Sequence, residues 1–357
     1  MSILLAADIG GTKTRLRLSQ LKAGVLSTLK QTQYNSGQWH SFDAVLDDFL
    51  QTHSKNNKPC HSACFAVAGP VRNSQDTRSS SLANVTNLPW KLCSQTLKQR
   101  FKLPLLSLIN DFQAIGHCVD VLDKKDFFTL QAGKTALDGA LNNTRAFIGA
   151  GTGLGQAIAV FNGVDYEIIS SEGGHVDFAP GNDFQVALYQ FLNQKYPHVS
   201  YERLLSGEGL FNIYQFFSQI CQADEQSIIE KEKILSQADK AKTIAQMAKV
   251  NPDGPAARSM ELFFRIYGAQ CGNLALNCLP SNGLFIAGGI AQKNLEYLKK
   301  SPFLSSFTAK GRMQQLMTCI PVKVITNADA GLSGATCVAA KQLGKPFTKQ
   351  RTPTSNA

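Results

Sequence analysis

The chain has 357 residues, of which 43% are hydrophobic and 17% charged, a composition typical of a globular protein with a sizeable core. This length predicts two domains or one large one. Lys and Arg exceed Asp and Glu by 36 to 26, giving a net charge of +10, but the basic residues are dispersed and no aromatic residues interleave them, so we expect no nucleic-acid partner. The excess charge is interpreted either as a field that attracts anionic substrates such as nucleotides or as solvated surface charge.

The sequence also argues against a membrane and a disulfide framework. It contains no run of 18 apolar residues, and its first residues lack the basic start of a signal peptide, so we expect a cytoplasmic protein with no membrane partner. The nine cysteines are scattered, which favours free thiols in a reducing compartment. Cys60 and Cys64 have no second Cys or His pair, so a metal site there is not expected.

The first predicted element is a β-hairpin over residues 6–18. Its apolar first strand ends near Asp8, and the turn contains Gly10, Gly11 and Thr12. Backbone N–H groups and a hydroxyl at such a turn can bind a phosphate, and a neighbouring carboxylate can hold Mg²⁺ through water. The alternative is an ordinary hairpin with a Gly-Gly turn.

Strands and helices then alternate. The patterns predict a helix at 41–52, a buried strand at 63–68, an exposed polar loop at 72–84, a helix at 94–101 and an apolar strand at 103–109. Asn110 and Asp111 follow that strand. A carboxylate there could accept a proton from a substrate hydroxyl that attacks phosphorus. The alternative is that Asp111 caps a helix beginning near Phe112.

A second glycine turn follows later in the chain. The apolar segment 145–149 leads into GAGTGLG and continues as QAIAVF, which echoes the first hairpin and predicts two related halves. Leu154 replaces the third glycine of a dinucleotide fingerprint, and no GxxxxGK[ST] is present, so Rossmann and P-loop folds are disfavoured. What remains is a nucleotide held by two hairpins.

The rest of the chain completes an α/β pattern. It predicts mainly helix over 183–246, a break at 252–255, a long helix over 257–279, a strand at 284–287 that ends in Gly288-Gly289, a strand at 322–325, a helix over 330–343 and a frayed polar tail from 345.

The run from Ser171 to Asp177, SEGGHVD, places two acids and a histidine around paired glycines. Carboxylates and imidazole in a tight turn suit paired hydrogen bonds to vicinal sugar hydroxyls. Glu202 could add a further carboxylate, or it could be an exposed acid at a helix start. The alternative for the whole run is a polar turn whose histidine bonds to neighbouring backbone.

These motifs, in this order, resemble the bacterial-type glucokinase family of the sugar kinase/Hsp70/actin superfamily. The matching segments span residues 8 to about 291 and are DIGGTKTRL, FAVAGPV, TNLPW, LINDFQAIG, GAGTGLG, SSEGGHVDFAP, YERLLSGEGL and AGGIA. The related ROK family shares DIGGTK but carries a Cys/His zinc cluster after its EGGH-like motif. Here VDFAP follows, with no CxCGxxGC, which argues against a ROK kinase or repressor.

The resemblance implies a two-domain actin-like ATPase (ribonuclease H-like) α/β fold with a sugar/ATP cleft between a small domain, 1–121 plus 327–357, and a large domain, 122–326. It implies phosphorylation of glucose by ATP at the 6-hydroxyl, the first step of glycolysis, by a Mg²⁺-dependent homodimer. Asp111 matches the family's general base. The sugar-binding positions are Asn87, Asn110, Asp111, Glu172, His175 and Glu202. The first phosphate motif comprises Asp8, Gly10, Gly11, Thr12 and Lys13, with Asp8 near magnesium. The second comprises Gly151, Thr152 and Gly153, and the adenosine motif is Gly288 and Gly289.

Three alternatives remain at this point. A kinase for another hexose or an N-acetylhexosamine would differ only in pocket contacts that the sequence does not resolve. A sugar-sensing regulator would have no need of a base at Asp111. An actin-like ATPase that transfers nothing to a sugar would have no use for Glu172 and His175.

Overall fold

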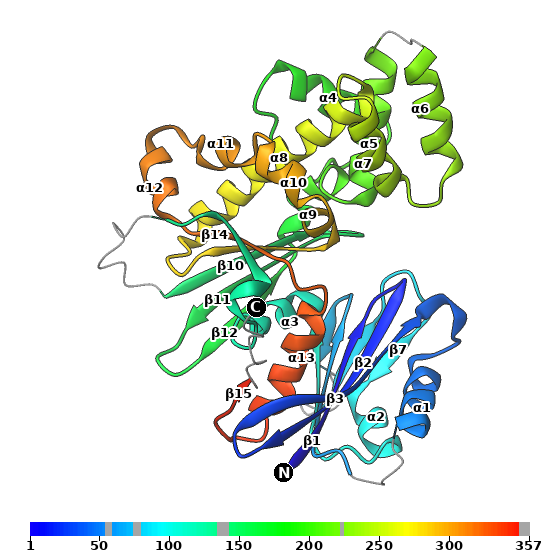
Figure 1. Cartoon of the computed structure of the whole chain (residues 1–357), viewed down its shortest axis with the longest axis vertical. Coiled ribbons are helices and arrows are strands. Elements are labelled where there is room, and N and C mark those ends of the chain that lie inside the picture. Colours follow the sequence, from blue (N-terminus) through cyan, green and yellow to red (C-terminus); the bar gives the residue numbers. More distant parts are fainter. Residues whose placement is uncertain (54–58, 74–79, 134–142, 222–224, 350–357) are drawn as a thin grey trace, which may run out of the picture. The chain divides into compact units, whose positions relative to one another are not determined.

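The computed structural model describes residues 1–53, 59–73, 80–133, 143–221 and 225–349. It divides into two compact units, which we describe separately (Figure 1). Unit 1 comprises Met1–Asp126 with Asp329–Ala357, and unit 2 comprises Phe127–Ala328.

Unit 1 is built on a six-stranded sheet with the order β15-β3-β2-β1-β4-β8. The strands are β1 Ser2–Ile9, β2 Lys13–Lys22, β3 Val25–Asn35, β4 Ser62–Val67, β8 Leu106–Asn110 and β15 Thr348–Lys349. The first three are antiparallel, which confirms the predicted hairpin, and β4 and β8 continue in parallel beyond β1. The helices are α1 Phe42–His53, α2 Ser94–Arg100, α3 Asp111–Cys118 and α13 Ala330–Lys341.

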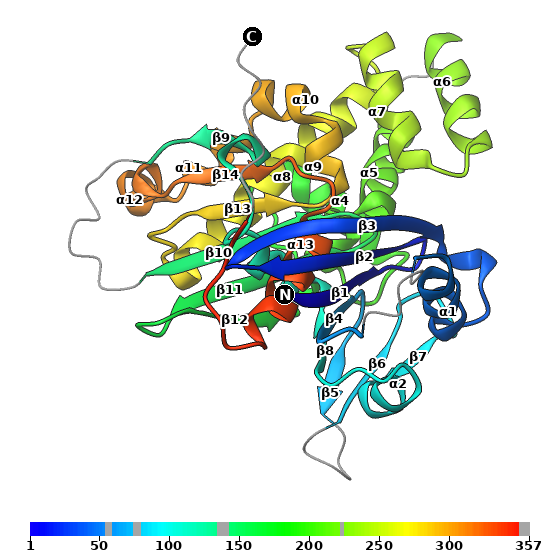
Figure 2. The ribbon, with the colours of Figure 1, turned by 60° about the horizontal axis from the view of Figure 1, so that its bottom comes forward.

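The side chains of β1 pack alternately into two cores, because successive side chains of a strand point to opposite faces of the sheet. Leu5 and Ala7 pack in one core with residues of α1 and α2. Leu4 and Ala6 pack in the other with residues of α3 and α13. Figure 2 shows α1 and α13 from a second direction. The sheet of unit 1 is therefore covered by helices on both faces.

Two expectations for unit 1 were wrong. The polar stretch 72–84 is not simply an exposed loop, because its two ends lie in strands: β5 Val71–Asn73 pairs with β6 Ser81–Asn84, and β6 pairs with β7 Lys91–Cys93. Ala83 lies in the core, and one buried residue suffices to anchor a short strand that otherwise reads as polar. The rest of that stretch, 74–79, lies outside the described residues. Within the tail expected to fray from 345, Thr348 and Lys349 form the short strand β15 beside β3, and residues 350–357 lie outside the described residues.

Unit 2 repeats the strand connectivity of unit 1. Its sheet has the order β12-β11-β10-β13-β14-β9. The strands are β9 Phe127–Gln131, β10 Thr144–Ala150, β11 Leu154–Phe161, β12 Tyr166–Ser171, β13 Leu284–Ala287 and β14 Val322–Ile325. An antiparallel set of three is again followed by two parallel strands beyond the first of the set. This confirms the two related halves predicted from the glycine hairpins.

The helices of unit 2 follow the predicted order. They are α4 Asp183–Asn193, α5 Gly207–Ile220, α6 Glu225–Ser236, α7 Lys240–Val250, α8 Pro255–Cys278, α9 Gly289–Lys293, α10 Leu295–Lys300, α11 Phe303–Thr308 and α12 Gln314–Cys319. The long helix α8 begins at Pro255, a position that suits proline because the first helical N–H has no partner. No helix among the described residues is long and apolar enough to cross a membrane.

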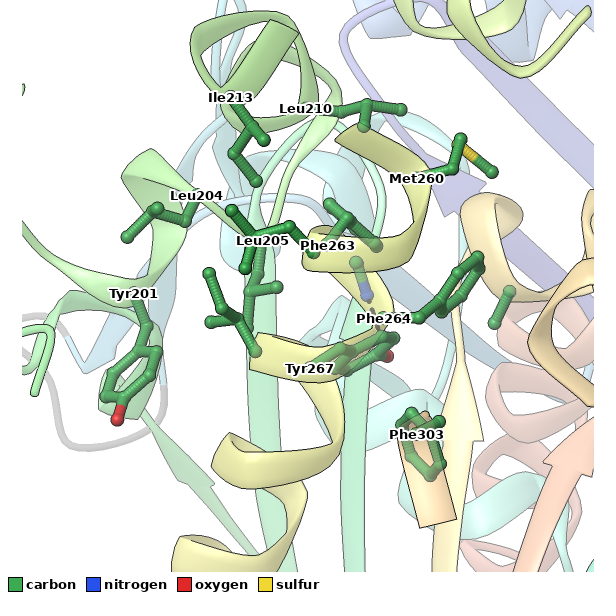
Figure 3. Packing of buried hydrophobic residues seen from close by; sticks show 14 of the residues in the cluster. Tyr201, Leu204, Leu205, Leu210, Ile213, Met260, Phe263, Phe264, Tyr267 and Phe303 are labelled. Carbon is green, nitrogen blue, oxygen red and sulfur yellow. Dashed lines mark hydrogen bonds between the residues drawn. The ribbon is translucent and has the colours of Figure 1, made fainter. Parts of the chain in front are cut away.

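Helix α8 fixes the end of β10 from within the core (Figure 3). Tyr267 of α8 is fully buried and packs edge-on against Phe303. Its hydroxyl accepts the N–H of Ala150 at 3.2 Å and donates to the carbonyl of Ile148 at 3.5 Å. The backbone immediately before the second glycine turn is thereby held by a core side chain.

Candidate active site

The register of the unit 1 sheet brings three strand ends to one edge. Ile9 of β1 pairs with Val67 of β4, and Val67 pairs with Asn110 of β8. Because parallel strands end at the same edge, the first glycine turn and Asp111 lie at that edge. Open α/β sheets bind their ligands at this kind of edge.

Hydrogen bonds hold the backbone of the first glycine turn. The Gly10 N–H donates to the Lys13 carbonyl at 3.0 Å, and the Ser36 hydroxyl donates to the Gly10 carbonyl at 2.8 Å. A Cβ on Gly11 would lie 2.7 Å from the Thr86 carbonyl oxygen and 3.5 Å from the Asn87 Cβ. The glycine therefore allows the turn to approach Asn87, and the structure brings this predicted sugar-binding residue beside the predicted phosphate turn. The side chains of Thr12 and Lys13 are exposed.

Asp8 lies across β1–β2 from Arg15, with their side chains 3.8 Å apart. Arg15 also approaches Asp329, with Nε 3.7 Å from Oδ1. Burial raises the pKa of Asp8, Arg15 lowers it, and Asp329 raises it again. Sequence reasoning missed Asp329, which directly precedes the helix predicted over 330–343 but belongs to none of the recognised motifs.

Asn110 takes the capping role that the sequence left open for Asp111. Its Oδ1 accepts the Phe112 N–H at 2.9 Å, its own N–H donates to Gln113 Oε1 at 3.0 Å, and its Nδ2 donates to the Gly69 carbonyl at 3.1 Å. Asp111 is the first residue of α3, and its Oδ1 also lies 2.9 Å from the Phe112 nitrogen. The interpretation of Asp111 as the helix cap is therefore wrong.

Unit 2 gathers its glycine motifs at one edge in the same way. Gly149 of β10 pairs with Ala287 of β13, so the turn Gly151–Gly153 and the Gly288–Gly289 pair follow neighbouring strand ends. The Gly151 N–H donates to the Gly153 carbonyl at 2.8 Å, and the Gly151 carbonyl accepts from the N–H of Gly207 at 2.9 Å. Thr152, at the tip, is exposed.

The predicted sugar cluster of unit 2 is assembled. His175 Nε2 lies 3.8 Å from Glu172 Oε2, and its Nδ1 lies 3.9 Å from Glu202 Oε1. Glu202 Oε2 accepts the Leu154 N–H at 2.8 Å, which ties this cluster to the second glycine turn. The side chains of Glu172 and His175 are 80% and 58% exposed, so they are available to a ligand. The polar-turn alternative does not explain why three titratable side chains converge here.

Two residues of this region were not predicted from the sequence. Gln156 of β11 is buried, and its Nε2 has no hydrogen-bond partner among the described residues. His198, in the segment after α4, contacts the backbone of His175. A single Gln or His between apolar residues has no motif that would single it out.

A family model described as Glucokinase matches residues 5–342. The chain belongs to the glucokinase family. It is similar to the glucokinase of Trichormus variabilis, with 41% identity over 96% of this chain and 100% of the relative. The Synechocystis glucokinase is 38% identical over 94% and 98% of the two chains.

Solved structures agree with this glucokinase-family membership. A glucokinase from an Antarctic psychrotroph superimposes with a TM-score of 0.78 at 28% identity, covering 96% of this chain and 99% of that one. A ROK-family glucokinase from Streptomyces griseus, solved with glucose and AMPPNP, matches with a TM-score of 0.58 at 18% identity, covering 95% and 100%, and shares the fold. These neighbours confirm the expected two-domain actin-like ATPase fold.

Proposed function

We propose that this glucokinase-family chain transfers the γ-phosphoryl group of ATP to the 6-hydroxyl of glucose, giving glucose 6-phosphate and ADP, the opening step of glycolysis. Full-length relatives named glucokinase support the activity. The observation that carries the mechanism is Asp111 at the start of α3, with Asn110 supplying the helix cap.

Asp111 is the proposed general base. A helix N-terminus stabilises the ionised carboxylate, which is the form that accepts a proton. As the sugar hydroxyl attacks phosphorus, its proton passes to Asp111, and such assistance is typically worth ~10²–10⁴-fold. Asn110 would hold the base in place because its amide bonds to both α3 and Gly69.

Each unit carries proposed sugar-binding residues. In unit 2, Glu172, His175 and Glu202 present carboxylate and imidazole groups suited to vicinal hydroxyls. In unit 1, we assign sugar binding to Asn87 and Asn110, as the family resemblance implies.

We assign binding of the ATP phosphates to the glycine turns. Gly10, Gly11, Thr12 and Lys13 form one proposed phosphate turn, Gly151, Thr152 and Gly153 the other, and Gly288 with Gly289 the adenosine site. Asp8 and Asp329 would hold Mg²⁺, directly or through water, since both offer carboxylate oxygens around Arg15, and hard cations prefer oxygen ligands. When bound, Mg²⁺ neutralises charge on the transferring phosphoryl group.

We also propose that units 1 and 2 are the small and large domains of the family, and that the protein is a cytoplasmic homodimer. The sequence boundaries at 121/122 and 326/327 lie within five residues of the unit boundaries at 126/127 and 328/329. The family resemblance is the support for the dimer.

The test compares two aspartates that follow an Asn helix cap. Asp111→Asn should lower kcat by at least about 10²-fold while ATP still binds, because only proton acceptance is lost. Asp183→Asn is the matched control, since Asp183 also begins a helix after a capping Asn, in α4. Near-normal turnover of Asp111→Asn in a coupled ADP assay would overturn the assignment.

The sugar is tested separately with the wild-type enzyme. ATP-dependent turnover should be most efficient with glucose when compared with mannose, fructose, N-acetylglucosamine and N-acetylmannosamine. A higher kcat/KM for another sugar would replace glucose as the substrate, and no turnover with any sugar would refute the kinase function.

A further inference from the structure

His198 has an acceptor facing each of its two ring nitrogens. Its Nε2 lies 2.8 Å from the carbonyl oxygen of His175, and its Nδ1 lies 3.3 Å from Asp177 Oδ1. A neutral imidazole carries one N–H, so it can donate to only one of these acceptors. The imidazolium donates to both.

The segment that His198 contacts carries the proposed sugar ligand His175. A short antiparallel ladder joins the same two segments: the Phe178 N–H donates to the Val199 carbonyl at 2.9 Å, and the Tyr201 N–H donates to the Val176 carbonyl at 3.1 Å. The ladder begins after His175: the His175 N–H donates to the Glu172 carbonyl at 2.9 Å, and the His175 carbonyl contacts the His198 ring. Glu202, the partner of His175 in the cluster, follows the other strand of this ladder.

We propose that His198 is a positioning residue whose protonated ring clamps the EGGH turn and so sets the affinity for the sugar. This inference rests on the proposed function, because it assigns the sugar to His175. The clamp is complete when His198 is an imidazolium, and one of its two hydrogen bonds is lost when the ring is neutral. Sugar binding should therefore be tighter at low pH, where the ring carries a proton on both nitrogens, than at high pH, where it carries one.

The charged surroundings of His198 are simple among the described residues. Asp177 is the ionic partner of the ring. His175 faces Glu172 and Glu202 instead, and Lys195, on the same segment as His198, approaches Glu208. Because His175 is itself a histidine, every variant in the experiment retains it.

Two substitutions separate the clamp from other effects. His198→Gln removes the imidazolium and should raise the glucose Kd about two- to five-fold at pH 6, the range expected of an exposed ion pair, with less change at pH 8. Asp177→Asn should keep the clamp at both pH values, because the amide can accept from the imidazolium and donate to the neutral ring. Its glucose Kd should therefore vary less with pH than that of the wild type. The exposed His40 of unit 1 provides the control His40→Gln, which should reproduce the wild-type profile.

The measurement is glucose binding by calorimetry without nucleotide from pH 5.5 to 8.5, with KM for glucose alongside. A wild-type profile in His198→Gln, or an unchanged slope in Asp177→Asn, would overturn the clamp. Neither result would touch the proposed function, which fails only if wild-type protein neither binds nor phosphorylates glucose. A circular dichroism spectrum and melting temperature matching the wild type would show that each variant is folded.

Discussion

At the scale of single residues, Asp8 is a carboxylate whose surroundings oppose its charge. Burial and Asp329 both raise its pKa, and Arg15, at 3.8 Å, compensates only in part. A raised pKa in the folded state means that unfolding releases a proton, so this group makes the protein less stable as pH rises through the shifted range. Sites that bind a cation or phosphate commonly carry such a cost in the free protein.

We therefore expect Asp8→Asn to raise the melting temperature of the ligand-free protein at pH 7 by about 1–3 °C, while kcat/KM for MgATP falls at least about ten-fold. The gain should shrink as pH is lowered, because the wild-type carboxyl, whose pKa is raised, becomes protonated. Differential scanning calorimetry over a series of pH values from 7 downwards measures it. The exposed Asp253 offers a control, Asp253→Asn, that should change neither quantity. A lower melting temperature for Asp8→Asn at pH 7 would show that its attraction to Arg15 dominates.

The sequence allowed some of these residues to be predicted and not others. Glu172 and His175 could be predicted because they flank paired glycines, and Asp111 because it follows an apolar strand. Asp329 and His198 could not be predicted, since their roles arise from contacts with residues distant along the chain, Arg15 and His175. The cap remained an alternative for Asp111 because Asp and Asn are about equally good caps, and only the backbone shows that the helix begins one residue earlier.

At the scale of elements, helix α3 carries the proposed base, and its position depends on α13. A Cβ on Gly334 of α13 would lie 1.7 Å from the Ala114 carbonyl oxygen of α3, so no side chain fits between these helices. Ala114, Leu332 and Ala335 belong to one buried cluster with β1 and β4. The C-terminal helix, remote from Asp111 in sequence, thus determines where α3 lies.

Gly334→Ala should force α3 and α13 apart, lowering the free energy of unfolding by about 1–3 kcal/mol. Because α3 begins with Asp111, kcat should fall by up to about a hundred-fold as well. Urea denaturation and the coupled assay measure these two effects. Gly37→Ala is the matched control, since its Cβ would meet only Asn35 Oδ1 at 3.9 Å. Wild-type stability with wild-type kcat in Gly334→Ala would refute this account of the packing.

Most elements could be predicted because their apolar periodicity was strong. Strand β13, Leu284–Ala287, was predicted with its observed bounds because it is apolar throughout and ends in two glycines. Strand β6 was missed because two of its four residues, Ser81 and Asn84, are turn or loop formers, and Ala83 alone is buried there. Strand β12 was missed because Tyr166–Ser171 lies at a sheet edge and is mostly exposed, which weakens the alternation.

At the scale of the whole molecule, both units share a five-stranded order, β3-β2-β1-β4-β8 in unit 1 and β12-β11-β10-β13-β14 in unit 2. Each has a glycine turn after the first strand of its antiparallel set, β1 or β10. A repeated hairpin supplies the two proposed phosphate turns without a P-loop. The net charge of +10 is also a property of the whole molecule, because the basic residues are dispersed along the sequence and form no cluster. Whether this charge serves catalysis depends on whether it attracts the nucleotide or is only solvated.

Salt separates these two interpretations, because MgATP is an anion and glucose is neutral. If the positive field steers the nucleotide, kcat/KM for MgATP should fall about three- to ten-fold between ~20 and ~300 mM ionic strength, while that for glucose changes by less than about 1.5-fold. Potassium and tetramethylammonium chloride should act alike, since screening does not depend on the identity of the cation.

Local contacts of ATP with the glycine turns would also be sensitive to salt, so the field of the whole molecule needs its own variant. The variant replaces four exposed lysines of α6 and α7 with Gln, namely Lys231, Lys233, Lys242 and Lys249. This lowers the net charge from +10 to +6 and changes no proposed site residue. If the overall field attracts MgATP, this variant should have a lower kcat/KM at low salt and a shallower salt dependence, with kcat unchanged. A salt dependence equal to that of the wild type would show that only charges near the phosphate turns act on the nucleotide. The remaining positive charge would then serve solvation alone.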